Sequence, residues 1–199
     1  MATLINPRST LLTDPLRNFR FLVTFQPQSS TPTLDALTKL TLGFTSVSGL
    51  AVTTDSIPYR EGGYNTTVHQ IPGQTSFTPL TLQRGVLLNT HQNWDWMKNL
   101  FAVIGGGSNR QSTQNFRCDL EIAVLSHPIP GSPNQNDNTV KVEDHVAMRF
   151  KVYNAWPTTV AYSDLNAGDN ALYVEQMTLV HEGFDINWAA DLTNSAQTF

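Results

Sequence analysis

Alternation of apolar and polar residues at a period of two is the feature that most constrains the fold of this 199-residue chain. The clearest case lies between residues 17 and 26, where every second residue is apolar: Phe19, Phe21, Val23 and Phe25. This spacing is typical of a half-buried β-strand. Further strands are predicted at 34–44, 75–84, 116–125, 142–154 and 171–184. The chain is therefore expected to be mainly β.

One segment follows a helical period instead. It runs from about Thr90 to about Ile104, with Asn89 or Thr90 as the N-cap and three glycines after its end. Its apolar stripe is predicted to lie in the core or in a subunit interface and comprises Trp94, Met97, Leu100, Phe101 and Ile104. The sequence therefore predicts a single helix packed on a β-structure.

A long hairpin is predicted in the first half of the chain. Ser46–Tyr59 is extended, Glu61-Gly62-Gly63 is a tight turn, and 64–71 forms the returning strand. Pro72-Gly73 is interpreted as a further turn. A small domain could hardly bury arms of this length alone.

Composition and charge exclude several classes of function. Charged residues make up only 14% of the chain, and the net charge is −4, which argues against binding to a phosphate backbone. Cys118 is the only cysteine, so no intramolecular disulfide can form and a buried structural thiol is expected. Neither a signal peptide nor a membrane-spanning segment is found in the sequence, and folding in a cytoplasm is expected.

No arrangement of residues with catalytic or metal-binding chemistry is found. The five histidines are scattered, with no metal-ligand spacing. No serine has the glycine spacing of a nucleophile elbow. The glycines at 105–107 follow a helix, whereas a phosphate loop precedes one. We therefore predict no enzyme activity, no metal and no cofactor.

Several short motifs occur in a definite order along the chain. They are Asp14-Pro15-Leu16-Arg17-Asn18-Phe19-Arg20-Phe21, Gly43-Phe44-Thr45-Ser46-Val47-Ser48-Gly49-Leu50, Pro58-Tyr59-Arg60-Glu61-Gly62-Gly63-Tyr64-Asn65, Ile71-Pro72-Gly73, Leu82-Gln83-Arg84-Gly85-Val86, the helix with Trp94 and Trp96, Asn154-Ala155-Trp156-Pro157, Asp164-Leu165-Asn166-Ala167 and His181-Glu182-Gly183-Phe184. The series resembles the tail tube family of contractile phages, tailocins and phage-derived injection systems over about residues 14–184.

The resemblance implies a fold of two packed antiparallel sheets, sandwich- or barrel-like, with one flanking α-helix and a long extended hairpin. In related proteins the segment corresponding to 50–69 lines the channel and bridges neighbours. We expect a single tail-tube domain over 1–199, with an N-terminal arm at 1–13, an inserted region at 105–139 and a C-terminal extension at 185–199.

Two sets of subunit contacts are predicted. The first surrounds the hairpin turn and comprises Tyr59, Arg60, Glu61, Gly62, Gly63, Tyr64 and Asn65. The second comprises Asn154, Trp156 and Pro157, for which a strand-ending turn with a buried tryptophan is an equally good interpretation. Both interpretations can hold together.

The function implied is that of a passive structural subunit in a virion. Hexameric rings would stack into a hollow tube inside a contractile sheath, assembled in the host cytoplasm with tape-measure and baseplate proteins. DNA would pass through the lumen without sequence-specific binding, and no membrane insertion is expected. Alternatives are the tube of a DNA-free injection system or tailocin, a baseplate tube initiator of the same fold, and a carbohydrate-binding module.

Overall fold

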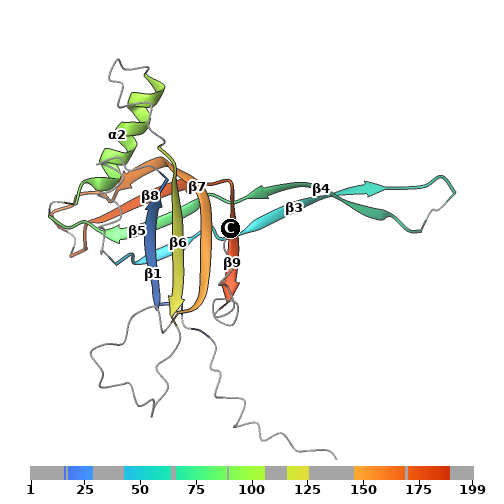
Figure 1. The fold of residues 1–199 in the computed structure, drawn as a ribbon, viewed down its shortest axis with the longest axis horizontal. Coiled ribbons are helices and arrows are strands. Elements are labelled where there is room, and N and C mark those ends of the chain that lie inside the picture. The colour runs from blue at the N-terminus through green and yellow to red at the C-terminus, as the bar shows by residue number, and fades with distance from the viewer. Residues whose placement is uncertain are drawn as a thin grey trace, which may run out of the picture.

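The computed structural model describes residues 16, 18–28, 43–63, 66–88, 90–105, 116–125, 146–168 and 170–188. These residues form nine strands and one helix (Figure 1). In chain order the elements are β1 Phe21–Pro27, β2 Ser46–Ser48, β3 Val52–Tyr59, β4 His69–Phe77, β5 Leu80–Gly85, α2 Gln92–Ile104, β6 Cys118–Leu125, β7 Val146–Tyr162, β8 Val174–Val180 and β9 Gly183–Trp188. Among the described residues no helix is long and apolar enough to cross a membrane.

The long strand β7 belongs to two sheets, which share it. Its first part pairs with β6 and β9, giving a first sheet in the order β1-β6-β7-β9. Its last part pairs with β8, giving a second sheet in the order β7-β8-β5-β2. All pairings are antiparallel, and inward side chains of both sheets form one core. The predicted fold class, two packed antiparallel sheets with one helix and a long hairpin, is confirmed.

The passage of β7 from one sheet to the other occurs at Asn154. This residue has a φ of 54°, a left-handed conformation that asparagine tolerates better than most residues. Its backbone N–H donates to Asp119 at 2.9 Å, and a register shift follows between Pro157 and Thr159. The prediction that a strand ends at 154 was wrong, since bends let the strand continue to Tyr162.

The core combines residues from both sheets. Val23 and Phe25 are buried as the alternation predicted, whereas Phe19 lies before β1 and is exposed. Cys118 is fully buried, as expected of a structural thiol, and burial raises its pKa to about 12.

The helix begins later and turns a different face to the core than the sequence predicted. It starts at Gln92, and the N-cap is His91, which makes no side-chain cap bond. Met97 and Leu100 are buried as expected, but the core also receives Asn93 and Trp96. The assignment of Trp94 and Phe101 to the core was wrong for the subunit alone, because they are 40% and 53% exposed.

The hairpin lies further along the chain than predicted and leaves the body of the subunit entirely (Figure 1). It spans Val52–Phe77 because Pro72 and Gly73, expected to form a turn, lie inside β4. Thr54 pairs with Thr75 and Ser56 with Pro72, so two residues of β4 lie opposite the single residue Asp55. Such a β-bulge sharpens the twist of the ribbon without ending it.

The expected domain boundaries fall partly outside the described residues. The arm at 1–13 and residues 106–115 and 126–139 of the inserted region lie outside them. The first four residues of the expected C-terminal extension, 185–188, belong to β9, and the extension as a whole stays a prediction.

Candidate assembly surfaces

Every residue of β3 is exposed, and so is every residue of β4 except the partly buried Gly73. Toward the tip, one face of the ribbon carries the facing pairs Ile57–Ile71 and Tyr59–His69. The other face carries Ser56, Pro58 and Gln70. A two-stranded ribbon with one apolar face is at best marginally stable in water by itself, so this face suits contact with another molecule.

The predicted contact residues at the hairpin turn are placed where the sequence put them. Tyr59, Arg60, Glu61, Gly62 and Gly63 are all exposed at the end of the ribbon. Gly63 has a φ of 95°, which a tight turn requires and glycine adopts without strain. Tyr64 and Asn65 lie outside the described residues.

The base of the hairpin is held to the body by backbone and aromatic contacts. Thr78 donates its N–H to the Ala51 carbonyl at 3.1 Å, and the Nε2 of His181 lies 3.1 Å from the Thr78 carbonyl. The ring of Phe77 packs against those of His181 and Phe184, with both centroid distances 5.8 Å. These contacts fix the direction in which the ribbon leaves the body.

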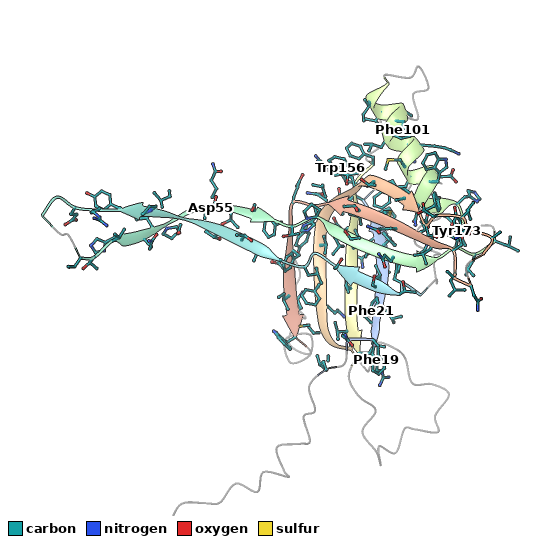
Figure 2. All side chains as sticks on the ribbon, turned by 180° about the vertical axis from the view of Figure 1, so that it is seen from behind. Phe19, Phe21, Asp55, Phe101, Trp156 and Tyr173 are labelled. Atoms are coloured by element: carbon teal, nitrogen blue, oxygen red, sulfur yellow. The ribbon has the colours of Figure 1, made fainter. Side chains whose placement is uncertain are left out.

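The second predicted set forms the corner between the two sheets. The amide of Asn154 donates to Glu182, and Gln28 donates to both Asn154 and Asp119. Trp156 is partly buried, and its ring packs edge-on against Phe116. Figure 2 shows that it lies on the body of the subunit, and Pro157 beside it in the chain is buried. The tryptophan therefore packs within the subunit, and a role in subunit contact stays a prediction.

A buried polar network that was not predicted from the sequence holds α2 to the second sheet. The Glu175 carboxylate accepts bonds from Arg84 at 2.6 Å, Asn93 at 2.9 Å and Tyr162 at 3.1 Å. Burial and, after it, the negative charge of Glu175 raise the pKa of Tyr162 to about 12. Arg84 and Glu175 face each other across β5 and β8, so only the strand register could have revealed the pair.

Comparison with known families gives a match over residues 17–185 to the T4-like virus tail tube protein gp19 family. This chain belongs to that family. No curated protein sequence is similar enough to the chain to match it. The resemblance read from the ordered motifs is thus confirmed.

Solved structures share the fold of this tail tube protein. A chain from the anti-feeding prophage baseplate has a TM-score of 0.62 at 21% identity, covering 88% of this chain and 97% of the other. A chain from the sheath-tube complex of an extracellular contractile injection system has a TM-score of 0.61 at 24% identity, covering 95% and 99%. A chain from the anti-feeding prophage tube-terminating cap has a TM-score of 0.60 at 24% identity, covering 89% and 93%.

The tail tube subunit has two unpaired edges on its first sheet. Strand β1 pairs only with β6, and β9 pairs only with β7, within the part of the chain that the structure describes. The two edge strands have seven and six residues and run antiparallel to each other. Unpaired edges of this kind invite pairing with another chain.

The outward face of the first sheet carries charges of both signs. Carboxylates on β6 and β9 flank two cations on β7: Asp119, Glu121 and Asp185 surround Arg149 and Lys151. Arg149 lies 3.0 Å from Glu121, and Tyr153 donates to Asp185 at 2.9 Å. Burial and the bond to Asp185 raise the pKa of Tyr153.

No group of three or more histidine, cysteine or acidic side chains among the described residues could hold a metal ion. The three histidines that the structure describes, His69, His91 and His181, lie on separate parts of the fold. His181 packs at the hairpin base, while the exposed Nε2 of His91 lies 3.2 Å from the Asp95 carboxylate. Both contacts are structural.

Proposed function

We propose that this tail tube protein assembles into hexameric rings that stack into a hollow conduit inside a contractile sheath, and that it has no enzymatic activity. The observation that carries the proposal is the pair of free edges on the first sheet. Because β1 and β9 are antiparallel and nearly equal in length, the β9 of one copy can pair with the β1 of the next. Ring closure then leaves no unpaired edge on the first sheet.

The hairpin supplies the second contact in this proposal. Its exposed apolar face, with Ile57 and Ile71, and the turn residues 59–65 reach beyond the body toward a neighbouring copy. Asn154, Trp156 and Pro157 shape the corner that a neighbour would meet. The sheath-tube, baseplate and cap complexes that contain chains of the same fold support sheath and baseplate proteins as partners.

DNA is the payload that the surface chemistry favours. Closing a barrel through β1 and β9 turns the outward face of the first sheet toward the lumen. There, three carboxylates against two cations leave one net negative charge per subunit (3 − 2 = 1) from these strands. Few cations are free to hold phosphates, so DNA would slide. Tape-measure protein would occupy the lumen during assembly in the host cytoplasm.

Electron microscopy of negatively stained purified protein tests assembly, and native mass spectrometry counts the subunits per ring. Six-membered rings or tubes are expected. A protein that stays monomeric at high concentration would contradict the proposal and favour a tube initiator or cap role. Neighbouring genes separate the remaining alternative, since capsid and terminase genes indicate a virus, and toxin cargo without a capsid indicates an injection particle.

A further inference from the structure

The inner face of the first sheet is closed at one edge and open at the other. One row of inward side chains crosses the sheet in register from β1 to β9 and consists of Val23, Ile122, Phe150 and Ile186. Val23 is 9% exposed and Ile122 2%, whereas Ile186 is 46% exposed. In the single subunit this apolar row therefore loses its cover at β9.

The neighbouring row repeats this asymmetry. Its members, in the same order of strands, are Phe21, Val124, Met148 and Trp188. Trp188 is 53% exposed. The hairpin base covers only the first inward residue of β9, where Phe77 packs on Phe184 at a centroid distance of 5.8 Å. Ile186 and Trp188, called here the open β9 end, therefore form an exposed apolar surface at the edge of the sheet.

Strand β1, at the other edge of the sheet, has the composition that this surface requires. Figure 1 shows β1 and β9 on opposite sides of β6 and β7. The inward side chains of β1 are Phe21, Val23 and Phe25, and none of its seven residues is charged. Pairing β1 with a second copy therefore removes no charge of its own from water.

The direction of the side chains limits how β9 and the β1 of a second copy can be aligned. Residues directly opposite each other in an antiparallel pair point to the same face of the sheet. If the inner face continues around the ring, Ile186 lies opposite Phe21, Val23 or Phe25. An alignment shifted by one residue would turn the inward side chains of one copy to the outward face of the next.

The bounds of the two strands favour one of these three alignments. With Ile186 opposite Val23, all six residues of β9 lie opposite residues of β1, because 183–188 then face residues 26 down to 21. Pro27, which has no N–H to donate, lies outside the new ladder in this alignment. Backbone pairing is therefore complete.

The other two alignments lose part of the ladder. With Ile186 opposite Phe21, the last two residues of β9 lie beyond the start of β1. With Ile186 opposite Phe25, Phe184 faces Pro27 and the first residue of β9 lies beyond the end of β1. Each leaves backbone groups of β9 unpaired at the joint.

We propose that β9 of one copy pairs with β1 of the next in a single register, with Ile186 opposite Val23. Trp188 then lies opposite Phe21. The inference rests on the proposed function, whose joint it specifies residue by residue. Side chains directly opposite each other are in contact range, so β1 of the neighbour covers the open β9 end. The apolar rows then run from each subunit into the next.

Disulfide trapping on the outward face tests this register and leaves the apolar rows unchanged. Two double variants place cysteines at positions that the register sets opposite each other: Leu22→Cys with Asn187→Cys, and Thr24→Cys with Asp185→Cys. Oxidised rings are run on a denaturing, non-reducing gel. Both variants should give a ladder from dimer up to the full ring, because opposite Cα atoms lie about 4.5–5.5 Å apart, within the reach of a disulfide.

Two shifted variants use the same four positions and are matched controls. They are Leu22→Cys with Asp185→Cys, and Thr24→Cys with Asn187→Cys. These pairs are diagonal in the proposed register, about 7–8 Å apart, and a disulfide does not span that distance without backbone movement. They should give no ladder under the same oxidation. The four single variants measure any cross-linking through Cys118.

An assembly measurement tests the cover of the open β9 end. Trp188→Asp should raise the protein concentration needed for ring formation by about tenfold or more. Leu165→Asp should leave it unchanged, because Leu165 is exposed in a loop outside β1 and β9. Circular dichroism of the dispersed subunit shows whether each variant is folded, and Ile186→Thr gives the same readout if Trp188→Asp misfolds. An unchanged concentration in a folded variant would contradict the contact.

The outcomes separate the register from the function on which it rests. Rings that cross-link only in the shifted variants overturn the register and leave the joint between β1 and β9 intact. Rings that cross-link in none of the four double variants overturn both the register and this joint, but not the tube itself. A wild-type protein that forms no rings overturns the proposed function and the inference together.

Discussion

The Nε of Arg84 lies 2.6 Å from the carboxylate of Glu175, and the two side chains are only 1% and 2% exposed. The pair joins β5 to β8 and, through Asn93, holds α2 in place. The position of the helix on the second sheet depends on this pair. Removing one partner leaves an uncompensated charge in the interior.

Arg84→Met is expected to destabilise the subunit by about 3–5 kcal/mol. Urea unfolding of the dispersed subunit measures the loss. The matched control is Arg149→Met, which breaks a partly exposed pair with Glu121 and should cost about 1 kcal/mol or less. The double variant Arg84→Met with Glu175→Gln removes the charge but keeps an acceptor for Asn93 and Tyr162, so it should recover most of the stability. A loss below that of the control would contradict the anchoring role.

Alkaline pH should destabilise the fold partly through Cys118. The thiol has a pKa of about 12 in the folded chain against an ordinary value of 9.0, so folding favours the protonated form. Its contribution is complete below pH 9 and is lost as pH rises through 12. The slope is at most about 1.4 kcal/mol per pH unit. Cys118→Ala should flatten stability measured between pH 9 and 12, and an unchanged slope would refute this assignment.

Gly49→Ala should be among the most damaging single changes at the hairpin base. A Cβ at this position would lie 2.1 Å from the Pro79 carbonyl oxygen, and the φ of 99° disfavours any side chain. Backbone strain and overpacking together cost about 3 kcal/mol or more. Gly62→Ala is the control, because its Cβ would meet open space. Thermal unfolding of the two variants measures the difference. Equal unfolding midpoints would show that the backbone around residue 49 relaxes and would contradict the prediction.

Much of this architecture is local in origin and could be predicted from the sequence. The strand at Phe21–Pro27, the helix and the exposed hairpin follow from periodicity and turn residues. The errors arise where non-local pairing overrides local signals. Pro72 and Gly73 look like a turn, yet a bulge opposite Asp55 absorbs them. Asn154 looks like a strand end, yet its left-handed backbone only redirects β7.

The candidate assembly site shows the same division. Turn residues such as Arg60 and Gly62 could be predicted because glycines mark a turn by themselves. The exposure of Ile186 and Trp188 could not be predicted, because it depends on which strand lies at the edge of the sheet. The face of α2 was misjudged for a related reason: Asn93 faces inward because Glu175 accepts its amide, and no helical period reveals a distant carboxylate.

The apolar face of the hairpin should matter for assembly and little for the fold of the subunit. Ile57→Thr with Ile71→Thr removes that face while keeping β-branched residues, so subunit stability should change by about 0.5 kcal/mol or less. Tubes seen by electron microscopy should be lost. Ser56→Thr with Gln70→Thr, on the opposite face, should still form tubes. A loss of tubes in both variants would mean that the ribbon, rather than one face, makes the contact.

Reversing one charge on the outward face of the first sheet should make the tube hold DNA. Glu121→Lys changes three carboxylates and two cations into two carboxylates and three cations, so the net charge of these strands changes from −1 to +1. Cations that neutralise phosphates release counterions, and the affinity then falls steeply with salt.

Co-sedimentation of tubes with short duplex DNA measures the effect. Wild-type tubes should leave the DNA in solution, whereas Glu121→Lys tubes should retain it at low salt and release it as salt rises. Asp164→Lys makes the same charge change in an exposed loop outside the first sheet, so it separates lumen chemistry from total charge. Equal retention by both variants would show that DNA meets the outer surface, and would refute the assignment of this face to the lumen.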